Sequence, residues 1–298
     1  MRVFVTGATG FIGSAVVKDL IAAGHQVIGL SRSAEKAPAL AAAGAEVIRG
    51  TVEEPERLKE GVDRSDGVIH LAFNHDFSKM AANCEDDRRV IATLATHLAG
   101  SRRPLLVTSG TAIANAKPGE LAMEDGPPIS AKVHPRAASE EATRAAAARG
   151  VNATVVRLPQ VHDAAKQGLI SPAIALYRAK GACAYVGDGS ARWPAAHVLD
   201  VARLYRLAIE RAEPNAIYHA VAEEGVPMRL IAEAIGRRLA LPVKSLSGDE
   251  AQDFFGWMAM FAGRDMPASG ARTRQTLQWT PNGPGLIDDL DRLDLSVN

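Results

Sequence analysis

The chain is predicted to fold as an α/β protein, with a doubly wound parallel sheet and a smaller lobe toward its C-terminus. Three observations support this fold class. The first residues join a strand-forming run, Arg2–Thr6, to three closely spaced glycines and a helical stretch, Ser14–Ala23. Strand-forming and helix-forming runs then alternate with short turns through the first half of the sequence, which is typical of parallel strands with helices on both faces. After Leu158 this alternation ends, which indicates a change of architecture.

The expected strands are short apolar runs, most of them rich in branched side chains. They are Arg2–Thr6, Val27–Leu30, Glu46–Ile48, Gly67–Ala72, Leu105–Thr108 and Thr154–Leu158. The helices expected between them are Ser14–Ala23, Ala34–Ala43, Glu54–Gly61, Asp86–Ala99 and Arg136–Arg149. A proline in the first turn of the third helix and glycines just after the other four are consistent with these ends.

The second half is predicted to combine a returning segment with a separate lobe. Its expected elements are a helix at Pro172–Lys180, a helix at Asp200–Glu210 with Asp200 as N-cap, a strand at Ile217–Val221 and a helix at Met228–Leu239. We assign residues 1–162 to the sheet domain, with 195–220 returning to it, and residues 163–194 and 221–298 to the smaller lobe.

The three glycines of the opening turn have distinct expected roles. Gly7 permits the tight turn, Gly10 lets the backbone approach a pyrophosphate, and Gly13 lets the helix lie close to the strand. The free N–H groups and dipole of the following helix favour an anion at this point. The sequence therefore predicts a dinucleotide site, although a tight turn without a ligand would use the same glycines.

Composition excludes several classes of protein. The chain has 34 Lys and Arg residues together and 34 Asp and Glu residues together, so it lacks the excess of positive charge that would indicate nucleic-acid binding. No apolar run approaches the ~18–20 residues of a membrane span, and the N-terminus lacks a signal-peptide pattern. Cys84 and Cys183 form no CxxC pair and are expected to be buried thiols of a cytoplasmic protein. The histidines show no metal-binding spacing, so no metal is expected.

Several segments resemble the extended short-chain dehydrogenases/reductases, the NAD-dependent epimerase/dehydratase family. The segment 6–13 (TGATGFIG) resembles the family signature TGxxGxxG, and 67–72 (GVIHLA), 157–159 (RLP), 198–202 (VLDVA) and 279–281 (WTP) resemble later family segments. The resemblance implies a Rossmann-type domain that binds a nicotinamide dinucleotide. The cofactor contacts that it implies are Gly7, Thr9, Gly10, Phe11, Ile12, Gly13, Thr51, Val52, Leu71, Ala72, Phe73, Thr108, Leu158 and Pro159.

The end of the second strand predicts which dinucleotide is preferred. Members of this family that use NAD usually carry an acidic residue there, whereas this chain has Ser31, Arg32 and Ser33. A guanidinium and two hydroxyls would bind a 2′-phosphate that a carboxylate would repel. We therefore expect NADP(H) to be preferred, with NAD(H) still possible, unless Arg32 is only a solvated surface residue. The usual Gly-Asp after the third strand is Gly50-Thr51 here, which leaves the adenine contact to the Val52 backbone.

The catalytic centre departs from the family pattern. Members use Tyr-x-x-x-Lys, but none of the four tyrosines of this chain begins that motif. Arg136 and Glu140 occupy the two equivalent positions. Arg136 cannot lose its proton, although it could polarise a carbonyl or bind a carboxylate or phosphate. The alternative is an i,i+4 contact between Arg136 and Glu140 at the start of a helix.

Polar side chains at the ends of the fourth and fifth strands are the other catalytic candidates. Ser109 or Thr111 could supply the hydroxyl that contacts the substrate oxygen, and the register does not distinguish them. Asn74 and His75 follow the fourth strand, and His75 could supply the proton that tyrosine gives in the family. The alternative is that these groups, with Asp76, cap turns.

The second half adds aromatic and basic candidates. Arg192 and His197 could face the same cleft, while Trp193 is expected to pack between the lobes. The apolar side chains of Phe254–Phe261 recur at helical spacing, which predicts a core face, the ceiling of a substrate pocket, or both.

Three functions are compatible with these features. The first is an NADP(H)-dependent oxidoreductase that moves hydride between nicotinamide and a carbonyl, C=N or C=C group of a small molecule. The second is a nucleotide-sugar epimerase or dehydratase, and the third is a non-catalytic NADP(H)-binding regulator. A homodimer through Asp86–Ala99 and Arg136–Arg149 is possible, because family members often pair through the equivalent helices.

Overall fold

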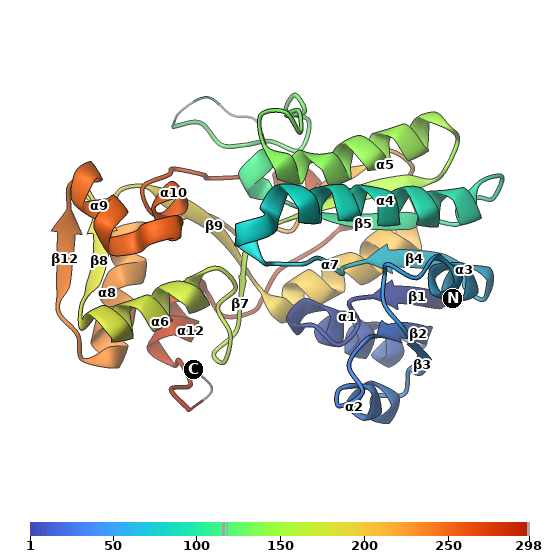
Figure 1. Ribbon diagram of the computed structural model, residues 1–298, viewed down its shortest axis with the longest axis horizontal. Helices are drawn as coiled ribbons and strands as arrows, with labels where there is room; N and C mark the ends of the chain where they lie inside the picture. The colour runs from blue at the N-terminus through green and yellow to red at the C-terminus, as the bar shows by residue number, and fades with distance from the viewer. Residues whose placement is uncertain (115–116, 118, 297–298) are drawn as a thin grey trace.

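A parallel sheet forms the centre of the larger part of the molecule in the computed structural model, which describes residues 1–114, 117 and 119–296 (Figure 1). Its seven strands follow the order β10-β6-β5-β4-β1-β2-β3 and all neighbours are parallel. They are β1 (Arg2–Thr6), β2 (Gln26–Ser31), β3 (Glu46–Arg49), β4 (Gly67–His70), β5 (Leu105–Gly110), β6 (Ala153–Leu158) and β10 (Ile217–His219). This arrangement confirms the predicted fold class.

Helices cover both faces of this sheet. One face carries α1 (Phe11–Ala22), α2 (Ala37–Ala42) and α7 (Val198–Arg211), whose apolar side chains share one core. The other carries α3 (Pro55–Asp63), α4 (Met80–Leu98) and α5 (Ala138–Ala148), which share a second core. The strand order reverses between β1 and β4, and in such sheets a crevice forms beyond the carboxyl ends of the strands at this point.

The rest of the chain builds a separate hydrophobic core, which lies to the left of the sheet in Figure 1. Its helices are α6 (Ile170–Lys180), α8 (Met228–Leu239), α9 (Gly248–Phe255), α10 (Ala259–Ala262) and α12 (Leu286–Asp291). The short pair β8 (Cys183–Val186) and β12 (Val243–Leu246) belongs to it. A three-stranded sheet of β7 (Gln160–His162), β9 (Arg192–His197) and β11 (Glu223–Pro227) and the helix α11 (Ala271–Leu277) complete the fold.

The predicted N-cap of α7 was wrong. The helix begins at Val198, directly after β9, and its N-cap is His197, whose Nδ1 accepts from the Leu199 N–H at 3.3 Å. Asp200 lies within the first turn and is buried. Its carboxylate accepts from the backbone N–H groups of Asn282 and Gly283 at 3.0 and 2.8 Å. The hydrogen bonds that we expected Asp200 to form with the start of the helix are therefore formed with a loop that is distant in the sequence.

Several other boundaries differ from prediction. The apolar stretch 254–261, whose spacing is helical, is not one helix, because Gly256 has a φ of +55° and separates α9 from the 3₁₀ turn η4 (Gly256–Met258) and α10. The helix α4 begins at Met80 and not at Asp86, and α2 covers only part of 34–43. β4 ends at His70, so Leu71 and Ala72 lie in the connection that follows it.

Both cysteines are free and buried, as predicted. None of the described helices combines the length and apolar character needed to cross a bilayer.

Candidate functional site

The opening turn brings β1 against the start of α1 in a way that requires glycine at two positions. Gly7 has a φ of +68°, and a Cβ there would lie 2.7 Å from the Ala72 backbone nitrogen. A Cβ on Gly13 would lie 2.1 Å from the Gly7 carbonyl oxygen. No real Cβ tolerates such contacts, so these glycines allow strand, turn and helix to approach as closely as they do.

The N-terminus of α1 fits the phosphates of a dinucleotide. Its N-cap is Gly10, no side chain caps it, and its first turn contains no acidic residue. The first N–H groups of a helix have no intrahelical acceptor, and the helix dipole adds partial positive charge there. The turn and α1 therefore present unneutralised donors where the family places a pyrophosphate.

The end of β2 is a turn held by side chains other than Arg32. Ser31 is buried and donates to the Ser33 carbonyl oxygen at 3.2 Å, while the Ser33 hydroxyl accepts from the Lys36 N–H. Arg49 donates to the Ser33 and Arg32 carbonyl oxygens at 2.6 and 3.4 Å. Arg32 itself is exposed, and none of the described residues forms an ion pair or hydrogen bond with its guanidinium.

After β3 the chain turns back into α3. The Thr51 N–H donates to the Glu54 carboxylate at 2.9 Å, and Val52 packs against the core beneath α3 and α4. Leu158 and Pro159, at the end of β6, are half-buried.

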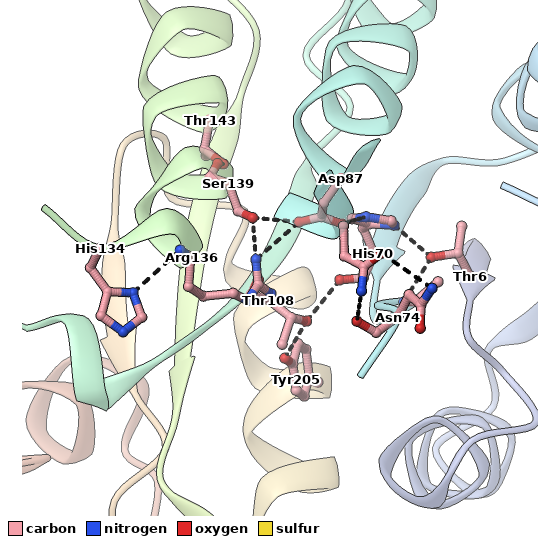
Figure 2. A network of polar contacts seen from close by, with 12 residues as sticks. Thr6, His70, Asn74, Asp87, Thr108, His134, Arg136, Ser139, Thr143 and Tyr205 are labelled. Carbon is pink, nitrogen blue, oxygen red and sulfur yellow. Dashed lines mark hydrogen bonds and ion pairs between the residues drawn. The ribbon is translucent and has the colours of Figure 1, made fainter. Parts of the chain in front are cut away.

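A buried polar network crosses the carboxyl edge of the sheet between β1, β4, β5 and α4 (Figure 2). His70 Nδ1 lies 2.7 Å from Thr6 Oγ1, and His70 Nε2 donates to the Asp87 carboxylate at 2.9 Å. Thr108 donates to the His70 carbonyl oxygen at 2.7 Å and lies 2.7 Å from the Tyr205 hydroxyl. These contacts fix the ends of three neighbouring strands relative to α4 and α7.

Asp87 is the acceptor at the centre of this network. Its carboxylate also receives Arg136 at 3.0 Å and the Ser139 hydroxyl. Burial would raise its pKa, but the hydrogen bond from His70 and the charges of His70 and Arg136 outweigh burial and hold the pKa below its usual range. Asp87 is therefore an ionised anchor beneath the crevice.

The predicted contact between Arg136 and Glu140 was wrong. Arg136 lies in the 3₁₀ turn η3 (Pro135–Ala137), which precedes α5, so the two residues do not share one regular helix. Arg136 donates to Asp87 and to the Thr108 carbonyl oxygen, and its guanidinium lies 4.0 Å over the Phe73 ring. Glu140 instead accepts two bonds from Arg157, both at 2.8 Å, and both partners are almost fully buried.

The hydroxyl candidates after β5 take different positions. Ser109 is buried beside the Glu140 carboxylate, and its Oγ has no hydrogen-bond partner of standard geometry within the described residues. Thr111 is also buried and donates to the Leu158 carbonyl oxygen at 3.3 Å. Ser109 thus retains the freer hydroxyl of the two.

The connection after β4 contains both a folded turn and an aromatic group. Asn74 accepts from the Asp76 N–H at 3.1 Å and contacts Asn83, and Asp76 caps the 3₁₀ turn η1 (Phe77–Lys79). The His75 ring lies between Phe73 and Phe77 at centroid distances of 5.1 and 6.3 Å. The surrounding protein and the charge of Arg136 lower the pKa of His75, so its imidazole is largely neutral at pH 7.

Aromatic residues of the second lobe contact the connection after β4. Trp257 stacks on Phe77 with a centroid distance of 4.9 Å, and Phe261 contacts both rings edge-on. Within the stretch 254–261, Phe254, Phe255 and Met258 are core, as predicted, whereas Trp257 stays 47% exposed.

Three candidate site residues from the second half of the chain do not join the aromatic group around His75. Trp193 packs inside the second lobe's own core and not between the lobes. Arg192 is paired with Asp265 at 2.8 Å. His197 lies against His162, so both are engaged away from the aromatic group around His75.

Sequence reasoning missed the residues that position the edge, above all Asp87, Tyr205 and His134. His134 is half-buried two residues before Arg136 and accepts from its N–H at 3.3 Å through Nδ1. Burial and the charges of Arg264 and Arg136 lower the pKa of His134. An acidic residue in a helix that flanks the sheet carries no local signal for such a role, because the contact forms only in the folded chain.

Comparison with known proteins supports the family. The model of the NAD dependent epimerase/dehydratase family matches residues 3–227. An uncharacterized protein of Schizosaccharomyces pombe is 46% identical over 97% of this chain and 98% of its own length. A 4-hydroxy-2-methyl-3-oxo-4-farnesyl-3,4-dihydroquinoline-1-oxide ketoreductase of Stigmatella aurantiaca is 30% identical over 77% and 70%.

Solved structures share the fold. A dTDP-glucose 4,6-dehydratase of Streptomyces venezuelae with NAD and TYD bound superposes with a TM-score of 0.79 at 19% identity, over 98% of this chain and 95% of that chain. A UDP-glucose 4-epimerase of Thermus thermophilus in complex with NAD gives 0.74 at 21%, over 98% and 97%. The chain belongs to the NAD dependent epimerase/dehydratase family of the extended short-chain dehydrogenase/reductase superfamily.

Proposed function

We propose that the protein is an NADP(H)-dependent oxidoreductase that transfers hydride between nicotinamide and a carbonyl, or a related C=N or C=C group, of a small organic molecule. The observation that carries this proposal is the Arg32 guanidinium at the end of β2, which has no partner among the described residues and stands where family members that use NAD carry an acid. A guanidinium binds a phosphate through charge-assisted hydrogen bonds. The printed names of relatives add support, since they include a 2′-dehydrokanamycin reductase and a 2-alkyl-3-oxoalkanoate reductase.

Several elements of the chain would each hold a different part of the cofactor. The turn Gly7–Gly13 and the start of α1 would hold the pyrophosphate, and Arg32 with Ser33 would hold the 2′-phosphate. Ser31 supports that turn from below, because its hydroxyl is buried and already bonded to the Ser33 carbonyl oxygen. When bound, the cofactor supplies or accepts the hydride.

The chain supplies orientation, charge and a proton acceptor. Asp87 and the Thr108 carbonyl oxygen hold Arg136 in one place over Phe73, so its positive charge is fixed beside the crevice. The N–H groups of Arg136 that are not bonded to Asp87, Ser139 or Thr108 would donate to a substrate oxygen on which negative charge develops. Burial and the charge of Arg136 lower the pKa of His75, which leaves a neutral imidazole that can accept a proton from a substrate hydroxyl, and Ser109 offers a hydroxyl that has no partner among the described residues.

The surroundings of His75 favour an apolar substrate over a nucleotide sugar. Phe73, Phe77 and Trp257 line the connection after β4, and rings of this kind bind flat or apolar groups. Arg192, which could have met a diphosphate, is neutralised by Asp265.

Turnover of NADPH with a panel of small ketones, aldehydes, imines and enones tests this function. We expect loss of reduced-nicotinamide absorbance with an apolar member of the panel, and a fall in kcat of about 10²-fold in His75→Gln and Ser109→Ala. The control is His25→Gln, since His25 follows the C-terminal end of α1 and pairs with Glu210.

Two results would contradict the proposal in different ways. NADPH binding with no turnover of any compound would favour the non-catalytic regulator. Purified protein that carries tightly bound NAD and consumes no external cofactor would favour an epimerase or dehydratase.

A further inference from the structure

A lysine from the connection between β7 and α6 lies over the start of α1. Lys166 is exposed, and its Nζ is 5.7 Å from the centroid of the Phe11 ring. Phe11 is the first residue of α1, so Lys166 contacts the residue that begins the uncapped N-terminus of that helix. Among the described residues, no carboxylate lies within 4.0 Å of Lys166 Nζ, so its charge is not neutralised by an ion pair.

The backbone beneath Lys166 is held firmly. The Asp163 carboxylate accepts from the N–H groups of Ala165 and Lys166 at 2.8 and 2.6 Å, and the Asp163 N–H donates to the Lys166 carbonyl oxygen at 2.9 Å. The Asp294 N–H donates to Ala164 at 2.8 Å, which ties the loop to the C-terminal segment. Only the flexible side chain of Lys166 remains to adjust, and its four-carbon stem suits contact with a phosphate.

Lys166 also supplies a positive charge that the rest of the site lacks. The family lysine of Tyr-x-x-x-Lys is replaced by Glu140, which is buried and bonded to Arg157 and therefore brings no cation to the cofactor. The other fixed cation nearby, Arg136, is committed to Asp87. Lys166 is thus a cation available on the side of the crevice that faces the glycine turn.

We propose that Lys166 is a cofactor-binding residue that closes over the pyrophosphate of the dinucleotide held at the N-terminus of α1. The proposal rests on the cofactor site described under the proposed function. Phe11 keeps the ammonium beside the turn through a weak contact with its ring, and this leaves the positive charge free for the phosphates. The turn and Lys166 would then contact the pyrophosphate from two sides, whereas Arg32 would contact only the 2′-phosphate and not the pyrophosphate.

Calorimetric titration with three ligands separates these two roles. The ligands are NADP⁺, NAD⁺ and adenosine 2′-monophosphate, which has the 2′-phosphate but no pyrophosphate. We expect Lys166→Met to weaken both dinucleotides by about tenfold, as the loss of one charge-assisted hydrogen bond would, and to leave adenosine 2′-monophosphate unchanged. Lys166→Arg should retain most of the affinity, and Arg32→Ala should weaken NADP⁺ and adenosine 2′-monophosphate but not NAD⁺.

The matched control is Lys180→Met. Lys180 is a lysine in the same kind of contact, with its Nζ 5.9 Å over the Phe254 ring, but it lies at the end of α6 in the second lobe. This variant should bind all three ligands as the unmodified protein does. Melting temperatures of all variants establish that each is folded.

Failure of this inference can be distinguished from failure of the proposed function. Unchanged dinucleotide affinity in Lys166→Met, with normal binding by the unmodified protein, would overturn the role of Lys166 alone. An effect of Lys166→Met on the KM of a carbonyl substrate without an effect on dinucleotide affinity would also overturn it, because the lysine would then serve the substrate. No binding of either dinucleotide by the unmodified protein would overturn the cofactor site itself.

Discussion

His219 shows how burial sets the charge of a single side chain in this protein. The residue is fully buried at the end of β10, where Nδ1 donates to the Ser269 carbonyl oxygen at 2.8 Å and Nε2 accepts from Arg157 at 3.2 Å. Burial and the charge of Arg157 lower the pKa of His219 to about 4. The imidazole is therefore neutral in the folded protein throughout the physiological range.

This lowered pKa predicts a loss of stability in mild acid. In the unfolded chain a histidine takes up its proton near pH 6.5, whereas folded His219 does so only near pH 4. Between these values the unfolded state holds more protons, so the free energy of unfolding falls as the pH drops. From pH 7 to pH 5 this one residue accounts for about 2 kcal/mol. Denaturant unfolding at the two pH values should show the loss, and His219→Gln should reduce it.

An NMR titration of His219 provides a second measurement that needs no variant. A His219 signal that titrates near pH 6.5 in the folded protein would contradict the assignment.

At this scale the sequence predicts residues whose role is local. Gly7 and Gly13 follow from the strand-turn-helix pattern, because their conformation and close contacts are set by neighbours in the chain. The partners of Arg136 could not be predicted, since Asp87 comes from another helix and the intervening η3 turn removes the i,i+4 relation with Glu140.

Among the secondary-structure elements, α4 is joined to the sheet by one carboxylate. Asp87, near the middle of α4, accepts from His70 of β4 and from Arg136 and Ser139 around the start of α5. It is 5% exposed, whereas its neighbour Asp86 faces solvent and contacts Arg89 of the same helix. These adjacent aspartates form a natural comparison between a buried and an exposed ion pair.

We expect Asp87→Asn to destabilise the protein by about 3 kcal/mol, because it leaves Arg136 partly buried without its counter-charge. Asp86→Asn should change stability by no more than about 0.5 kcal/mol, since exposed pairs contribute little. Urea unfolding of the two variants measures both effects. Equal losses in the two variants would show that the network does not anchor α4.

The elements of the first half were predictable and many of the second half were not. Parallel strands buried on both faces are continuous apolar runs, and the sequence shows most strands from β1 to β6 as such, whereas the edge strand β3 is short and begins and ends with an exposed charged residue. The strands β7, β8, β9, β11 and β12 are short and mixed in composition, and their pairing depends on contacts between distant segments. The break at Gly256 was missed because the apolar spacing continues across it.

At the scale of the whole molecule, both parts of the chain contribute groups near the candidate site. The sheet contributes the glycine turn and the polar network, and the remainder contributes Lys166 beside Phe11 and Trp257 against Phe77. The resemblance to the family predicted the sheet and the cofactor class from a few motifs. It could not predict the groups contributed by the other part, because those depend on how the two cores meet.

Cofactor preference connects these scales, because we propose that one residue, Arg32, sets the specificity of a site built by several elements. We expect the unmodified protein to bind NADP⁺ at least about tenfold more tightly than NAD⁺, since a bound 2′-phosphate gains charge-assisted hydrogen bonds from the guanidinium. Arg32→Ala should remove this preference. Arg89→Ala, which changes an exposed arginine on α4, should keep it.

Isothermal titration of the purified protein and of Arg32→Ala with NADP⁺ and NAD⁺ is the most direct measurement. Tighter binding of NADP⁺ that disappears in Arg32→Ala is the result that our account predicts. Equal or tighter binding of NAD⁺ by the unmodified protein, or an unchanged NADP⁺ affinity in Arg32→Ala, would contradict it.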